Sequence, residues 1–65
     1  MHVYVNGREQ EIRACFLAEL LTELGFQGDW LAIAINDEVI TAVERESYKI
    51  CESDRIEILS PMQGG

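Results

Sequence analysis

One amphipathic helix limits how this chain can fold more than any other pattern in it. Within residues 16–24, leucines recur at the i, i+3, i+4 and i+7 spacing of one apolar stripe, namely Leu17, Leu20, Leu21 and Leu24. Gly25 follows where a left-handed residue would end the helix, whereas no Ser, Thr, Asp or Asn stands just before Phe16 to cap its start. Because one helix with one stripe covers one face of one sheet, the pattern predicts a two-layer α+β domain.

Short strands are predicted on both sides of this helix. Residues 2–5 alternate polar and β-branched side chains, which predicts a strand with its two valines buried. Asn6-Gly7 then indicates a type I′ hairpin turn, because both central residues of that turn need positive φ. The strand after it, residues 8–13, is mostly charged, which is typical of a sheet edge.

After the helix, residues 31–35 alternate large and small side chains. The large ones should face the helix, and Ala32 and Ala34 should form a flat patch on the opposite face. Asn36-Asp37 indicates a turn into a short fourth strand. The last strand is predicted over residues 55–60, with its isoleucines inward.

The remaining segments carry weaker patterns. Gln27-Gly28-Asp29 is predicted to be a loop, and Glu52-Ser53-Asp54 to turn the chain into the last strand. Glu44-Arg45-Glu46 is predicted to be a solvated face, while Tyr48 and Ile50 are predicted to fill the core.

The order of these elements suits a β-grasp arrangement, in which the first and last strands lie side by side in the middle of the sheet. We therefore expect one α+β, two-layer β-grasp domain over residues 1–60, with a mixed sheet of about four or five strands and one main helix on one face. A flexible Gly-Gly tail should follow at residues 61–65.

Composition narrows the class of partner. Twelve acidic residues against five basic ones give a net charge of −7, which argues against nucleic acid and against an anionic membrane surface. No apolar run approaches the ~20 residues that span a membrane. A basic protein is the natural counterpart, although acidity also simply keeps a small protein soluble. A chain of 65 residues buries too little surface for a deep, enclosed active site.

The two cysteines, Cys15 and Cys51, form no metal-binding pattern. They are not in a CxxC motif and His2 is the only histidine, so a zinc site has too few ligands of the usual kind. We predict two packed or half-packed thiols in a cytoplasmic protein, with a single disulfide left open.

The ending Pro61-Met62-Gln63-Gly64-Gly65 directly follows an apolar strand pattern. Glycine has no Cβ, so a Gly-Gly end can enter a channel too narrow for side chains. Pro61 should end the strand and direct the tail outward. The reactive group that such a tail offers is the α-carboxylate of Gly65; the alternative is a frayed terminus.

Four segments, residues 3–7, 17–21, 32–39 and 56–65, together resemble the ThiS family, the sulfur carriers of thiamine biosynthesis. The resemblance covers nearly the whole chain, is most specific at the ending, and implies the ubiquitin-like β-grasp fold. The chain departs from the family where Pro-Arg and then Trp are common, since Thr41, Ala42 and Arg45 stand there. It also departs at 52–54 and at Phe16, where the family often has Asp-Gly-Asp and Thr.

The resemblance implies a cycle in which the chain is a carrier and not an enzyme. A ThiF-like adenylyltransferase uses ATP to adenylate Gly65, and sulfur from a cysteine-derived donor then replaces the adenylate to give a thiocarboxylate. The thiazole synthase ThiG uses that sulfur. No cofactor is expected on this chain, which shows no nucleophile–base pair and no Gly-rich phosphate loop. Gly64, Gln63 and Met62 would present the carboxylate.

Docking to these enzymes needs a surface as well as a tail. If the valines of the first strand and the isoleucines of the last point inward, the residues between them point outward. We expect one exposed apolar, partner-binding area formed by Tyr4, Leu59, Met62, Ala32 and Ala34.

Three other functions remain open from the sequence. The first is a sulfur carrier of the type of the molybdopterin-synthase small subunit, and the second is a ubiquitin-like modifier that uses the same carboxylate for an isopeptide bond. The third is a non-carrier ubiquitin-like interaction module that binds through its sheet alone.

Overall fold

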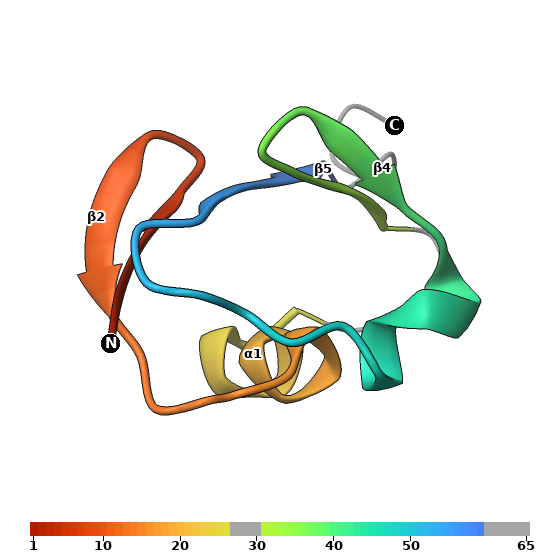
Figure 1. Cartoon of the computed structure of the whole chain (residues 1–65), viewed down its shortest axis with the longest axis horizontal. Helices are drawn as coiled ribbons and strands as arrows, with labels where there is room; N and C mark the ends of the chain where they lie inside the picture. The colour runs from red at the N-terminus through yellow and green to blue at the C-terminus, as the bar shows by residue number, and fades with distance from the viewer. Residues whose placement is uncertain (27–30, 60–65) are drawn as a thin grey trace.

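The computed structural model describes residues 1–26 and 31–59 of the chain. A five-stranded sheet forms one layer, and the helical elements form the other (Figure 1). In chain order the elements are β1 His2–Val5, β2 Arg8–Glu11, α1 Leu17–Leu24, β3 Ala32–Ile35, β4 Glu38–Ile40, the 3-10 helix η1 Ala42–Glu46 and β5 Arg55–Leu59.

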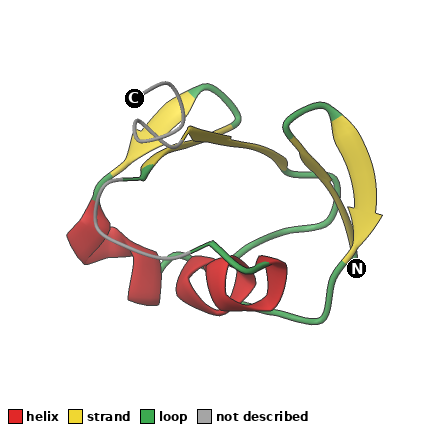
Figure 2. Ribbon diagram, turned by 180° about the vertical axis from the view of Figure 1, so that it is seen from behind, coloured by secondary structure: helices red, strands yellow, loops and turns green. Residues whose placement is uncertain are grey.

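The strand order β2-β1-β5-β3-β4 places the first and last strands together in the middle of the sheet. β1 and β5 are parallel, with Tyr4 beside Arg55, and the other neighbouring pairs are antiparallel. The charged β2 is an edge strand. This mixed sheet with one α-helix on one face confirms the predicted two-layer β-grasp fold (Figure 2).

The core lies between the sheet and α1 and follows the predicted alternation. Its buried side chains are Val3, Val5, Ile12, Ala14, Leu17, Leu20, Leu21, Leu31, Ile33, Ile35, Ile40, Ile50, Ile56 and Ile58. Leu24, the last leucine of the helical stripe, is only partly buried, as are Phe26 and Tyr48. Both α1 and the inner face of every central strand are thus specified by spacing alone.

Backbone hydrogen bonds close the C-terminal end of α1, and a side-chain carboxylate caps its start. Gly25 adopts the expected left-handed conformation, with φ 87°, and Phe26 N–H donates to the Leu21 carbonyl at 2.8 Å in a Schellman arrangement. At the start, the Phe16 side chain has no hydrogen-bond acceptor, and the Glu19 carboxylate instead accepts from the Cys15 and Phe16 N–H groups at 3.1 and 3.3 Å. An acid one turn into the helix therefore replaces the missing cap.

The segment between β4 and β5 begins with a similar device. The Glu44 carboxylate accepts hydrogen bonds from the Thr41 N–H at 2.9 Å and the Thr41 hydroxyl at 3.0 Å. These bonds, first the backbone one, hold the pKa of Glu44 below its usual value. Thr41 thus begins η1 as a capping residue.

The prediction of a solvated face at 44–46 is wrong for Arg45. Its side chain is buried, with 9% exposure, and its Nη2 donates to the Leu31 carbonyl at 2.7 Å. Leu31 precedes β3, so its carbonyl lies outside the strand ladder and requires a donor from elsewhere. Glu44 and Glu46 are exposed as predicted.

The prediction of packed thiols is also wrong, because Cys15 and Cys51 are both exposed and free. Their neighbours Ala14 and Ile50 take the inward positions. Asp54, predicted only as a turn residue, is buried and accepts the Cys51 N–H at 2.8 Å. The turn before β5 is therefore fixed by a buried carboxylate.

Replacing Arg45 with Met should destabilise the fold by about 1–3 kcal/mol, because the Leu31 carbonyl loses its donor while the apolar stem is kept. The free energy of unfolding in urea measures the effect. Arg13→Met, at an exposed position, removes the same charge and should cost much less. Equal losses in the two variants would contradict the role given to the Arg45 hydrogen bond.

Candidate functional site

The face of the sheet turned away from α1 carries the residues that the sequence assigned to docking. The registers of β1, β5, β3 and β4 place together on it the side chains of Tyr4, Arg55, Glu57, Leu59, Ala32, Ala34 and Val39. Tyr4, Leu59 and Ala32 are exposed and Ala34 is half-buried. The alternation of the strands therefore puts each predicted residue of this part of the chain on the predicted face.

An apolar hollow of about 140 Å³ lies at one end of this face and is lined by Ala32, Ile33, Ala34, Val39, Glu57 and Leu59; we call it the Leu59 hollow. Ala32 lies beside Leu59, and Ala34 beside Val39. Two small residues thus lie between two large ones, which leaves room for a partner's side chain. Val39 and Leu59 are 75% and 67% exposed, far more than an apolar side chain of the core.

The sequence analysis assigned neither Glu57 nor Val39, which both line this hollow, to docking, and Val39 is the apolar one of the two. It follows the Asn36-Asp37 turn and precedes the buried Ile40, so strand alternation was the signal that assigns it to the outer face. The turn signal located the hairpin but did not by itself give the register that sets Val39 against Ala34.

Tyr4 lies in a second hollow. On β5 its neighbour is Arg55, four residues before Leu59, or roughly 13 Å along a strand. This second hollow, which we call the Tyr4 hollow, has a volume of about 260 Å³ and is lined by Tyr4, Gly7, Asp37, Arg55, Ile56 and Glu57. The expected single apolar area is therefore two hollows that share Glu57.

The predicted tail residues Met62, Gln63, Gly64 and Gly65 lie outside the described residues, as do Pro61 and the predicted loop at 27–29. β5 ends at Leu59, so the last described residue lines the Leu59 hollow. The last residue before the segment that the structure does not describe therefore lies at the more apolar of the two hollows.

β5 is held at both ends by asparagine side chains from hairpin turns. Asn6 has φ 52°, as the type I′ turn predicted at Asn6-Gly7 requires, and Asn36 has the same φ. The Asn6 amide accepts the Ile58 N–H at 2.8 Å and donates to the Ile58 carbonyl at 3.2 Å. The Asn36 amide accepts the Arg55 N–H and donates to Asp54 Oδ1, both at 2.9 Å. The sequence showed the turns but not these contacts.

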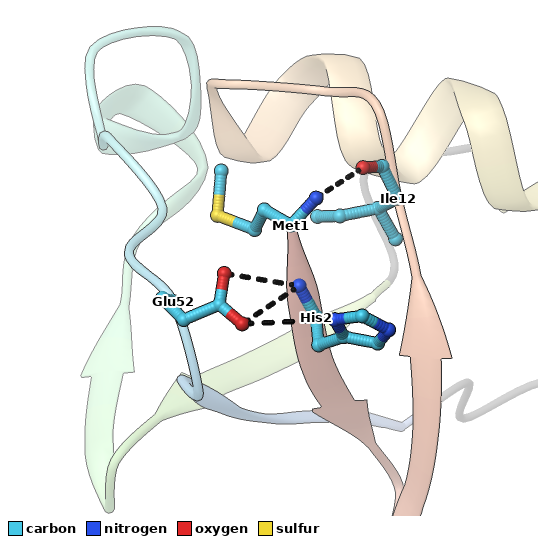
Figure 3. A network of polar contacts seen from close by, with 4 residues as sticks. All are labelled: Met1, His2, Ile12 and Glu52. Carbon is cyan, nitrogen blue, oxygen red and sulfur yellow. Dashed lines mark hydrogen bonds and ion pairs between the residues drawn. The ribbon is translucent and has the colours of Figure 1, made fainter.

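A polar network ties the start of β1 to the segment before β5 (Figure 3). The Met1 ammonium donates to the Ile12 carbonyl at 3.2 Å. Glu52 accepts the His2 N–H at 3.2 Å and lies 3.7 Å from His2 Nδ1. Each contact joins segments that are distant in sequence, so the network fixes the chain's own geometry.

Among residues 1–26 and 31–59, no group of three or more His, Cys, Asp and Glu side chains is arranged to hold a metal ion. Within the same residues, no helix has the length and apolar character needed to cross a membrane.

The Asn6 contacts can be separated from the turn, because Asn6→Gly keeps a residue that accepts positive φ. Loss of both bonds to Ile58 should cost about 1–3 kcal/mol and speed hydrogen exchange at the Ile58 amide. The matched variant Asn36→Gly should speed exchange at Arg55 instead. If both variants accelerate exchange equally at the two positions, the asparagines do not hold the two ends separately.

Comparison with known proteins gives one consistent result. The ThiS family model matches residues 3–65. A curated protein of Thermus thermophilus named sulfur carrier protein ThiS is 29% identical over 63 residues, which are 97% of this chain and 98% of that protein.

Solved structures agree with this result. The crystal structure of the thiamine biosynthesis protein ThiS from Geobacter metallireducens matches with a TM-score of 0.85 and 26% identity over 100% of both chains. A solution NMR structure of a thiamine biosynthesis protein from the same organism matches with a TM-score of 0.80 and 25% identity, over 100% of this chain and 88% of the other.

Proposed function

Because the chain belongs to the ThiS family, we propose that it is a sulfur carrier of thiamine biosynthesis whose C-terminal Gly65 is adenylated and then converted to a thiocarboxylate. The observation that carries the proposal is the extent of the family match, which begins in β1 and runs through Gly65. The β-grasp architecture, shared over the whole chain with a ThiS crystal structure, supports it independently.

The chemistry of the terminal carboxylate explains why such a carrier needs activation. An α-carboxyl group has a pKa of about 3.3–3.7, so at neutral pH it is an anion and a poor electrophile. In the proposed cycle its oxygen attacks the α-phosphorus of ATP on an adenylyltransferase, and pyrophosphate leaves. A cysteine-derived sulfur at the oxidation level of sulfide (HS⁻) then attacks the acyl carbon, and AMP leaves. The resulting thiocarboxylate is a soft nucleophile that a thiazole synthase can use.

The catalytic groups in this proposal belong to the partner enzymes, and the chain is their co-substrate. Its own contribution is binding and presentation, for which β5 and the two hollows are suited. The cycle is proposed for the cytoplasm, where exposed thiols such as those of Cys15 and Cys51 are kept reduced.

The Leu59 hollow is the proposed docking surface for the adenylyltransferase. Its exposed apolar side chains gain free energy when a partner covers them, and Leu59 lies at the root of the tail. The net charge of −7 speeds encounter with a basic enzyme surface. Docking at this hollow would hold the tail near the nucleotide of the activating enzyme.

Removal of Gly65, or extension beyond it by a residue that cannot be cleaved, should abolish sulfur loading. Intact-mass spectrometry after incubation with the adenylyltransferase, ATP and a sulfur donor should show exchange of one oxygen for sulfur in the natural chain only. The control Cys15→Ser/Cys51→Ser should load normally. Loading of the truncated chain would refute the proposal, a protein–protein adduct would indicate a modifier, and no change in the natural chain would favour an interaction module.

Leu59→Asp and Val39→Asp should each weaken binding to the adenylyltransferase by about tenfold or more, because a charge in an apolar contact costs roughly 1.4 kcal/mol or more. Val43→Asp is the matched control, since Val43 is 89% exposed and lies on η1. Calorimetric titration measures the affinities. Equal weakening by Val43→Asp would show that added negative charge alone is responsible.

A further inference from the structure

We propose that the Tyr4 hollow receives the guanidinium group of an arginine on the partner protein, with the Tyr4 ring as a stacking surface and Glu57 as the paired carboxylate. The inference rests on the proposed function only for the identity of that partner, the adenylyltransferase. The chemistry of the occupant comes from the hollow itself.

Charge is the first support. Of the groups that line the hollow, Asp37 and Arg55 already pair with each other at 3.3 Å. Glu57 makes no ion pair or hydrogen bond with any side chain in the described part of the chain. Glu9, directly across from Tyr4 on β2, adds a further negative charge beside it. The hollow therefore offers an uncompensated carboxylate and favours a cation.

The lining also distinguishes arginine from lysine. Tyr4 is 39% exposed, and its neighbour on β5 is Arg55, two residues before Glu57 on the same face of the strand. A planar guanidinium can stack on an aromatic ring while its N–H groups donate to a carboxylate, whereas a compact ammonium ion does this less well. An aromatic ring and a free carboxylate in one hollow thus match arginine.

Size and position indicate a protein side chain as the occupant. A volume of about 260 Å³ is below the roughly 300–1,000 Å³ of small-molecule pockets. Glu57 lines both hollows, so a protein that docks at Leu59 covers the Tyr4 hollow by continuing along β5. Ala34 beside Glu57 is too small to cover its carboxylate.

The chemistry of the occupant can be tested without any enzyme. N-acetyl-arginine methylamide, titrated into the ¹⁵N-labelled full chain, should shift the amide resonances of Tyr4, Gly7 and Glu57. The neutral isostere N-acetyl-citrulline methylamide should not, and the shifts should be lost in Glu57→Gln. Absence of arginine-specific shifts, or shifts spread equally over all acidic segments, would overturn the proposal.

The partner can be tested by the affinity of the adenylyltransferase for variants of the chain. Glu57→Gln and Tyr4→Leu should each weaken binding by about tenfold, within the range for cation–π and charge-pair contacts, while Tyr4→Phe keeps the ring and should bind normally. The affinity of the double variant should fall by less than the product of the two single fold-changes, because both residues contact one cation. Glu46→Gln removes the same charge from η1 and should have little effect.

The outcomes separate this inference from the proposed function. Equal effects of Glu57→Gln and Glu46→Gln, or independent effects of the Tyr4 and Glu57 changes, would overturn the shared arginine. Self-association that is lost in Glu57→Gln would instead assign the hollow to a second copy of the chain. Failure of the natural chain to form the thiocarboxylate would refute the proposed function but leave the arginine titration as a valid test.

Discussion

The parallel pairing of β1 with β5 is the interaction on which the rest of this structure depends. It joins the two ends of the described chain across the middle of the sheet, and such long-range pairing is costly in loop entropy. Backbone hydrogen bonds extend this pairing beyond Tyr4 and Arg55. The Tyr4 N–H donates to the Asp54 backbone carbonyl at 2.9 Å, and the Asn6 N–H donates to the Ile56 carbonyl at 2.8 Å. Side chains then complete it at both ends.

The side chains of Glu52 and Asn6 complete the pairing at the two ends of β1. At one end of β1, Glu52 accepts the His2 N–H, and at the other end the Asn6 amide continues the ladder to Ile58 after β1 has turned away. A short strand in a small domain exposes a large share of its hydrogen-bonding groups at its ends. Side chains that act as additional rungs therefore allow β5 to extend past its parallel neighbour.

The two hollows follow from the registers of β5 with its two neighbours, β1 and β3. β3 sets Ala32 and Ala34 against Leu59 and Glu57, so small side chains lie beside large ones at the end of β5. Near β1, Tyr4 and Arg55 are both large, and the charged residues Asp37 and Glu57 also line the hollow. In the proposed docking surface, an apolar subsite would supply affinity and a charged one would supply selectivity along the same strand.

The fold was predictable because its elements are specified by local patterns. The leucine spacing gives α1, the alternation gives the buried faces of β1, β3 and β5, and two Asn-containing turns give the hairpins. Arg45 and Asp54 were not predictable, because a buried charged side chain is determined by one distant carbonyl or one turn N–H that only the folded chain brings near. The division of the outer face into two hollows depends in the same way on strand register.

The wrong prediction that bears on function is the burial of the two thiols, because Cys15 and Cys51 are both exposed. Both lie beside the start of α1, because Ile50 N–H donates to the Cys15 carbonyl at 2.8 Å and Cys51 follows directly. Neither cysteine lines the Leu59 hollow or the Tyr4 hollow. An acyl-adenylate is readily captured by a nearby thiolate. A carrier that binds its activating enzyme through the outer face of the sheet keeps its own thiols away from the enzyme site where that intermediate forms, so their exposure is compatible with the proposed chemistry.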